Sequence, residues 1–151
     1  YLKGLPYKLN IIYIKSIPKV EIQDNEFIYL YVRQGTSCEK REAILRSWYK
    51  EELILTLNPL IEKWEKTLNV KINSFDIKRM KTIWGSCNIR KKHIRFNLEL
   101  IKKQPHCIDY VVAHELTHLI ERLHNERFKS ILTTHLPYWR ETKNELNKFS
   151  G

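Results

Sequence analysis

The feature that most constrains the fold is an H-E-x-x-H motif at residues 114–118. On a helix, positions i and i+4 lie on the same face about 6 Å apart, so both imidazoles can reach one ion. Apolar residues 111–113 precede the motif and can bury the other side of the helix. The motif therefore predicts a fold built around a helix that carries a metal site.

The residue types in this motif indicate a particular chemistry. Zinc accepts neutral imidazole nitrogens at about 2.0–2.1 Å, which makes His114 and His118 candidate ligands. Zinc lowers the pKa of a bound water towards about 7, and Glu115 is placed to take its proton and pass it to the leaving group. The motif favours metal-assisted hydrolysis over the alternative of two surface histidines on an amphipathic helix.

A catalytic zinc site needs a third protein ligand and an open fourth position. His124 is the leading candidate, but a continuous helix would place it about 240° around the axis and ~9 Å further along. We therefore expect the chain to turn after about Arg122, although Glu121 stands where metzincins have the glycine that makes this turn. The alternative, as in gluzincins, is a glutamate from a later helix, Glu141 or Glu145.

The first part of the chain reads as strands followed by a helix. Residues 7–14 and 26–32 are rich in strand-forming types, and residues 24–25 have turn chemistry, so we predict a small antiparallel sheet. Thr36 and Glu39 resemble a capping box at the start of a helix.

Helical spacing then continues to Leu68, with Pro59 expected to kink or restart the helix and Asn69 to cap it. Further along, residues 72–77 and 94–96 are predicted strands. Pro105 opens a helical run over 108 to about 122, and two more helices are predicted over 126–134 and 138–149.

These elements predict an α+β fold with its helices concentrated towards the C-terminus. We divide the chain into an N-terminal β-strand region (1–35) and a core (36–151), and expect them to form one compact unit. The length of 151 residues suits one domain with a real core.

Cysteine content and hydropathy indicate the compartment. Three cysteines cannot all pair within one chain, and an odd, sparse set favours a reducing environment. No uncharged apolar stretch approaches the ~18 residues of a membrane span, and the start has no secretory pattern. We predict a soluble cytoplasmic protein without membrane partners, and interpret Cys87 and Cys107 as small buried residues rather than metal ligands.

Positive charge is concentrated in one segment. The net charge is +10, and residues 71–103 hold ten Lys and Arg against two acidic residues. Such a field attracts polyanions, and Trp84 and Phe96 within it are candidates for stacking on bases. The alternative is a solvated lysine-rich surface. The candidate nucleic-acid-binding residues are Arg79, Lys81, Arg90, Lys91 and Lys92.

Several segments together resemble the YgjP-like branch of the SprT-like zinc metallopeptidases. They are MKTIWGSC at 80–87, IRFNL at 94–98, IDYVVAHELTHL at 108–119, LHNERF at 123–128 and PY at 137–138. The resemblance covers most of residues 5–148, and the combination is far more specific than the H-E-x-x-H motif alone. The chain begins at Tyr1 without the upstream strands usual in this family, which favours a fragment or a trimmed chain.

The resemblance implies a minimal zincin-like fold, with a small sheet packed against the active-site helix and an edge strand that aligns a peptide. It implies that His114, His118 and His124 bind one zinc ion per chain and that Glu115 is the catalytic base of an endopeptidase. Asp109 could orient a ligating imidazole or stabilise the helix N-terminus.

Some positions depart from the family pattern. Ile83 stands where a basic residue is usual, Leu123 and Asn125 flank the third histidine in place of Asn and Ser, and Lys129 replaces a common Trp. None of these positions is a predicted ligand or base, so the departures concern substrate preference.

Residues beyond the metal site are assigned to the substrate. Trp84 either lines the substrate cleft or is simply packed, and Gly85 would permit close backbone approach there. The tetrahedral transition state also needs an oxyanion donor. The candidates, among which the sequence does not choose, are Tyr110 and the predicted substrate-binding residues His135 and Tyr138.

Two functions are therefore carried forward. The first is a zinc-dependent endopeptidase, and the alternative is a nucleic-acid-associated binding module with a structural or vestigial metal site. The resemblance joins them, because SprT-like relatives include the Spartan proteases that act on DNA-bound proteins. YgjP-like proteins are often encoded beside restriction-modification systems, which implies DNA, DNA-bound proteins or restriction-modification components as partners.

Overall fold

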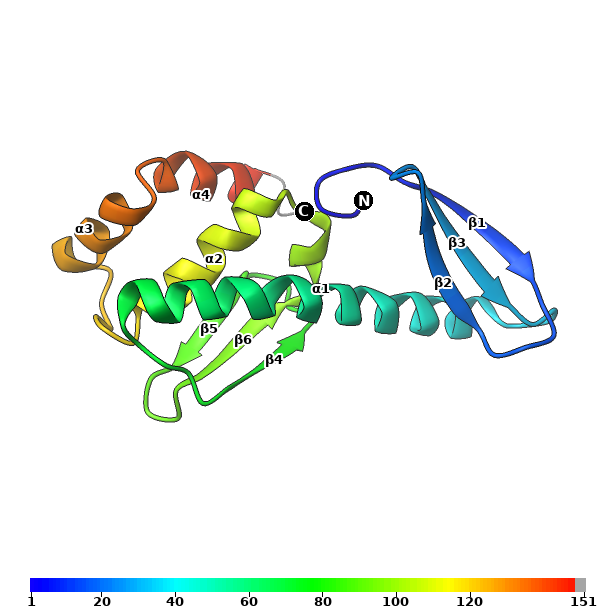
Figure 1. The fold of residues 1–151 in the computed structure, drawn as a ribbon, viewed down its shortest axis with the longest axis horizontal. Helices are drawn as coiled ribbons and strands as arrows, with labels where there is room; N and C mark the ends of the chain where they lie inside the picture. The colour runs from blue at the N-terminus through cyan, green and yellow to red at the C-terminus, as the bar shows by residue number, and fades with distance from the viewer. Residues whose placement is uncertain (149–151) are drawn as a thin grey trace.

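Two small sheets lie along one long helix in the computed structural model, which describes residues 1–148 (Figure 1). The predicted ends of the last helix, Phe149, and of the core region, at 151, lie outside the described residues. The first sheet contains β1 (Lys8–Tyr13), β2 (Lys19–Gln23) and β3 (Phe27–Val32). The second contains β4 (Ser74–Lys78), β5 (Gly85–Asn88) and β6 (His93–Asn97).

The first sheet differs from the predicted antiparallel pair, because β1 and β3 are parallel. Strand β2, which the sequence analysis missed, pairs antiparallel with β3 through a tight turn. Asp24 and Asn25 in this turn have φ of 55° and 50°, the left-handed conformation that hairpin turns favour, and the Glu26 N–H donates to the Gln23 carbonyl. Strand β2 takes one edge of β3, and β1 takes the other edge in parallel, from Lys8 beside Phe27 to Tyr13 beside Val32.

Helix α1 (Cys38–Leu68) links the two sheets and is continuous through Pro59. Pro59 lies on the exposed side of the helix, where water can hydrate the carbonyl that loses its donor. The N-cap is Ser37, whose side chain accepts from the Lys40 N–H at 3.2 Å, so the predicted cap at Thr36 is wrong by one residue. Asn69 adopts the predicted left-handed cap, with φ 53° and ψ 49°.

The second sheet, α1 and three later helices enclose the main core. These are α2 (Pro105–Thr117), α3 (Glu126–His135) and α4 (Trp139–Lys148), and a short helix, η1 (Leu98–Lys102), precedes them. Helix α2 lies in the centre and contacts α1, β5, α3 and α4. The predicted strands β4 and β6 are confirmed, whereas β5 had not been predicted as a strand. Fully buried side chains of this core include Leu53, Leu57, Ile94, Phe96, Leu100, Ile108, Val112 and Leu116.

The first residues of the chain pack on the main core, which contains α2 and the second sheet, rather than on the first sheet (Figure 1). Leu2 is part of the main core, and the Lys3 N–H donates to the Ile101 carbonyl at 2.7 Å. Gly4 has φ 82°, and a Cβ there would lie 2.4 Å from Cγ of Gln104, so only glycine fits this approach. Within residues 1–148, no helix combines the length and the apolar character that crossing a membrane requires.

Candidate metal centre

Helix α2 begins at Pro105 as predicted but ends earlier than expected, at Thr117 instead of about Arg122. The Ile120 and Glu121 N–H groups both donate to the Thr117 carbonyl, which closes a tight turn at the end of the helix. Residues 118–125 are all described and none has a positive φ, so this reversal needs no glycine. The early turn is what brings His124 back to the helix.

Three imidazoles converge where α2 ends. The Nε2 atoms of His118 and His124 are 3.0 Å apart, and the centroid of the His114 ring lies 5.0 and 5.1 Å from those of the other two rings. One ligand atom from each of the three residues lies within 4.8 Å of the others. The structure therefore brings together all three histidines that the sequence singled out.

Hydrogen bonding and burial prepare these rings to accept a cation. The Nδ1 atom of His118 is 3.3 Å from the carbonyl of Glu121, which can only accept, so in the neutral ring Nε2 keeps the lone pair. Burial lowers the pKa of His118, and burial with the neighbouring histidines lowers the pKa of His124. Both rings are thereby favoured in the neutral form that metals bind.

Glu115 lies beside this cluster and is almost fully buried, with 3% of its surface exposed. Its Oε1 atom is 3.2 Å from Nδ1 of His114, whereas its buried Oε2 atom has no hydrogen-bond partner in the described structure. An unpartnered buried carboxylate oxygen is costly unless a further group binds there. Three convergent imidazoles next to this oxygen therefore fit a zinc ion together with the water it would activate.

Gly85, the first residue of β5, packs directly against the side chain of Glu115. A Cβ at Gly85 would lie 3.0 Å from Cγ and 3.3 Å from Oε2 of Glu115. The first residue of β5 thus approaches the carboxylate more closely than any side chain would allow. The group that Gly85 approaches is Glu115, and its predicted place in the substrate cleft stays a prediction.

Two further ionisable side chains are influenced by Glu115. Burial, with a contribution from the Glu115 charge, raises the pKa of the Cys87 thiol to about 11 and that of Tyr110 to about 12. Both groups therefore keep their protons at neutral pH. The Tyr110 ring also lies 5.7 Å from that of His114, so a protonated phenol adjoins the cluster.

Phe128 is a site residue that the sequence analysis did not single out. It is 2% exposed, and its ring lies 5.1, 4.7 and 4.9 Å from the rings of His114, His118 and His124. The side chain of Asn125 accepts from the Phe128 N–H at 3.1 Å and caps α3. An apolar residue four positions after the third histidine, on a capped helix, was the available signal.

Asn97 is a second missed residue, and it fixes the loop before β5. Its buried side chain donates to the carbonyls of Met80 and Ile83, at 2.8 Å each, and accepts from the Met80 N–H. Its own N–H donates to the Trp84 carbonyl at 3.0 Å. These bonds hold the segment that ends in Trp84 and Gly85 against β6. The signal was present only as part of the IRFNL segment.

Other candidate residues lie elsewhere or have other partners. Glu145, an alternative third ligand, is 2.7 Å from His106 at the far end of α2, and Glu141 is exposed on α4. Asp109 accepts from Trp64 and from a lysine of α1 instead of orienting an imidazole. His135 is exposed, with its ring 6.0 Å from that of Trp64.

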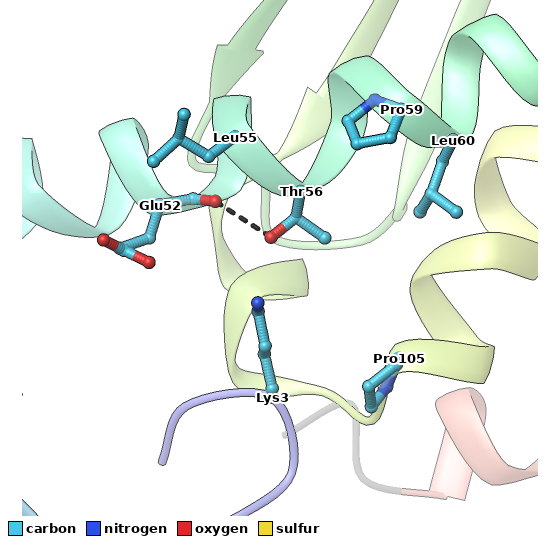
Figure 2. A pocket seen from close by; sticks show the side chains of 7 residues that line it. All are labelled: Lys3, Glu52, Leu55, Thr56, Pro59, Leu60 and Pro105. Atoms are coloured by element: carbon cyan, nitrogen blue, oxygen red, sulfur yellow. Dashed lines mark hydrogen bonds between the residues drawn. The ribbon is translucent and has the colours of Figure 1, made fainter. Parts of the chain in front are cut away.

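A surface hollow of about 320 Å³, shown in Figure 2, is lined by none of the three histidines. It is bounded by α1, the N-terminal segment and the start of α2, and within residues 1–148 none of its lining residues is a predicted site residue. Its lining residues are Lys3, Glu52, Leu55, Thr56, Pro59, Leu60 and Pro105. We assign no chemistry to this hollow.

Comparison with known proteins agrees with this description. The family model described as "YgjP-like, metallopeptidase domain" matches residues 1–149. No curated protein matches the chain. The crystal structure of the metallopeptidase zymogen of Pyrococcus abyssi abylysin is similar, with TM-score 0.56 and 18% identity over 60% of this chain and 92% of that one. The zymogen of Methanocaldococcus jannaschii jannalysin gives TM-score 0.55 and 21% identity, over 62% and 88% respectively. At these identities, the two structures show that the fold is that of small metallopeptidases.

Proposed function

Because the chain belongs to the YgjP-like metallopeptidase family, we propose that it is a zinc-dependent endopeptidase with His114, His118 and His124 as ligands and Glu115 as base. One observation carries this proposal. Three imidazoles converge beside a buried carboxylate oxygen that has no hydrogen-bond partner within residues 1–148. Each of these groups is of the type that zinc-assisted peptide hydrolysis requires.

Each residue has a defined task in this mechanism. A bound zinc ion would supply an activated water molecule and polarise the scissile carbonyl. Close packing against Gly85 holds the Glu115 carboxylate in position. Its Oε2 atom accepts the proton of the attacking water, and the carboxyl group then delivers that proton to the leaving amine. Hydrogen bonding of His118 to the Glu121 carbonyl holds the ring in the tautomer that leaves Nε2 free.

We further propose that the substrate binds as an extended peptide along β5. This strand is at the edge of the second sheet, paired with β6 on one side only, and it contacts α2. A peptide added to the free edge would run past Gly85, where no side chain separates it from Glu115. Trp84, half-buried before β5, would flank that peptide.

An oxyanion donor completes the proposed site. Tyr110, His135 and Tyr138 are the candidates, and we favour Tyr110 because its ring contacts His114 and its hydroxyl stays protonated. Tyr110→Phe should then lower kcat about 100-fold with little change in KM. A similar loss in Tyr138→Phe alone, with Tyr110→Phe unaffected, would move the role to Tyr138.

The proposal is tested by metal content and cleavage of an unstructured protein substrate in matched variants. His124→Ala should lose one zinc equivalent relative to wild type, together with cleavage. Glu115→Gln should keep the metal and lose at least about 100-fold in kcat. Glu141→Gln is the control, because this exposed glutamate was the other alternative ligand and should change neither quantity. Cleavage retained by a clean Glu115→Gln preparation would overturn the assignment.

Recruitment of the enzyme by DNA is a second candidate. Its support is a cluster of exposed basic side chains in the turn between β5 and β6, at Arg90, Lys91 and Lys92, with Lys81 also exposed. Arg79 is paired with Glu99, and Phe96 is fully buried, so the predicted stacking role of Phe96 is wrong. The substrates would then be DNA-bound proteins, including restriction-modification components.

Salt dependence tests this recruitment. Binding to duplex DNA should weaken steeply with salt, and replacing Arg90, Lys91 and Lys92 by alanine should reduce the slope of log K against log salt by up to about 3. Absence of binding at low salt would exclude recruitment by DNA.

We also place the protein in the cytoplasm, in accord with its three free cysteines.

A further inference from the structure

A second group of metal-binding side chains lies at the opposite end of α2. His106 and Cys107 are in the first turn of this helix, and Glu145 reaches them from α4. The Nε2 atom of His106 is 2.7 Å from Oε2 of Glu145 and 3.6 Å from Sγ of Cys107. One ligand atom from each residue lies within 4.8 Å of the others. Along the helix, His106 precedes His114 by eight residues, or about 12 Å, so the two groups are separate.

The chemical types in this group are those that zinc selects. Thiolate, imidazole and carboxylate are its three common protein donors, and a thiolate disfavours the hard cations magnesium and calcium. Ligand atoms around tetrahedral zinc are separated by about 3.3–3.8 Å, so the observed spacings need only small side-chain rotations. His106 and Cys107 are adjacent on α2, and Glu145 from α4 places a ligand atom within 4.8 Å of both.

We propose that His106, Cys107 and Glu145 form a second zinc site that fastens α4 to the first turn of α2. The half-exposed side chains of His106 and Glu145 leave the fourth position open to water. Cys107 is 2% exposed, so its sulfur anchors the site from the protein side. The site adds to the single zinc that the sequence predicted, makes Cys107 a ligand where the sequence favoured a small buried residue, and does not depend on the proposed function.

Cobalt(II) provides a direct test, because a cysteine ligand gives a thiolate-to-cobalt charge-transfer band that histidine and glutamate do not. Metal-free protein is titrated with cobalt and with zinc, and absorbance and stoichiometry are recorded. Wild type should bind two equivalents and show the sulfur band. Cys107→Ser should lose the band and one equivalent. Cys87→Ser is the matched control and should keep both, since Cys87 lies near Glu115.

Variants of the histidine cluster separate the two sites. His124→Ala should lose the other equivalent and keep the sulfur band. If the histidine cluster bound no metal, wild type would bind one equivalent, and the sulfur band and its loss in Cys107→Ser would stay as expected. If Cys107→Ser does not fold, His106→Ala and Glu145→Gln should each weaken cobalt binding at the sulfur-containing site at least about tenfold. A wild-type protein without the band, or a band that persists in Cys107→Ser, would overturn the inference.

Discussion

The two sheets of this protein have the same topology, but only the second is associated with a candidate site. In each sheet the third strand is central, the first strand runs parallel to it and the second antiparallel. Each sheet also lies along α1 (Figure 1). Strand topology and a shared helix are therefore not what makes the site.

The difference lies in what covers the sheets. Strand β5 of the second sheet contacts α2, and Gly85 meets the carboxylate of Glu115. In the first sheet, α1 contacts β2 and β3, while apolar side chains of β1 remain partly exposed, at 49% for Leu9 and 57% for Tyr13. Helix α2, which carries His114 and has His118 as its C-cap, packs against the edge strand of the second sheet, and this contact distinguishes the sheet that adjoins the candidate site.

The largest expected effect comes from truncating the centre of the first sheet. Leu30 on β3 is 1% exposed and lies outside the core that surrounds α2. Leu30→Ala should lower the free energy of unfolding of this sheet by about 3–4 kcal/mol. The activity per folded molecule should stay unchanged. Hydrogen exchange resolved by segment, with kcat/KM measured in parallel, checks both statements.

Ile94→Ala is the matched variant on the central strand of the second sheet, where Ile94 is fully buried. It should lower protection in β4–β6 and in α2, and reduce activity with it. If Leu30→Ala instead loosened α2 as much as Ile94→Ala does, the two halves would be one cooperative unit. The contrast between the sheets would then be one of chemistry only.

The next effect concerns the contact between β5 and α2. Gly85→Ala places a Cβ 3.0 Å from Cγ of Glu115, so the carboxylate or the strand must move. We expect kcat to fall by up to about 100-fold with metal content unchanged, because a displacement of about 1 Å in the proposed base would cost that much and the added Cβ forces a shift of a few tenths of an ångström. Steady-state kinetics and metal analysis test this.

Gly35→Ala, before α1, is its control. Gly35 has φ 84° and no atom within 4 Å of an added Cβ, so the change should cost about 1–2 kcal/mol of stability through backbone strain alone. Turnover should be unaffected. Equal kinetic losses in both glycine variants would show that general destabilisation, and not the position of Glu115, lowers the rate.

A smaller effect is expected at Phe128, whose ring contacts all three imidazoles. Phe128→Leu keeps an apolar side chain but removes the flat surface that orients them. The zinc dissociation constant should rise about tenfold, as measured by competition with a chelator. Phe75→Leu, at a ring stacked edge-on against Phe96 in the second sheet, should reduce stability without changing zinc affinity. Equal affinities in the two variants would make Phe128 a packing residue only.

What the sequence could predict differs between local and long-range features. Helix ends at Pro105 and Asn69 follow from each residue's own conformational limits and were predicted. The spacing in the H-E-x-x-H motif led to three histidines that the structure brings together. The roles of these histidines and of Glu115, and the division of the chain at residue 35, stay predictions.

The misses depended on pairing and packing between distant segments. Strand β2 was overlooked, and the direction of β1 followed from that omission. Asn97 and Phe128 act through contacts with residues from other turns and helices, which no local pattern encodes. The end of α2 at Thr117 likewise reflects a turn bonded to its carbonyl, where residue propensity alone favoured a longer helix.

The smallest expected effect compares ion pairs on the outer faces of the two sheets. In the second sheet, Arg95 binds both carboxylate oxygens of Asp76, and this lowers the Asp76 pKa from its ordinary value of 3.8, with a smaller contribution from His93. In the first sheet, hydrogen bonds from Lys19 and Tyr31 lower the pKa of Glu21.

A depressed carboxyl pKa means that the folded state binds a proton less readily than the unfolded state. The stabilisation is therefore present above pH 3.8 and is lost as pH falls through the lower, folded-state pKa. Because the Asp76 side chain is 42% exposed, solvent screening limits the effect to under about 1 kcal/mol. Asp76→Asn should flatten the decline in urea-unfolding stability from pH 5 to pH 2 (roughly the range over which carboxylates titrate), and Glu21→Gln should do so less. A larger change in Glu21→Gln would mean that the first sheet relies more on its surface charges than on the packing of β3 against α1.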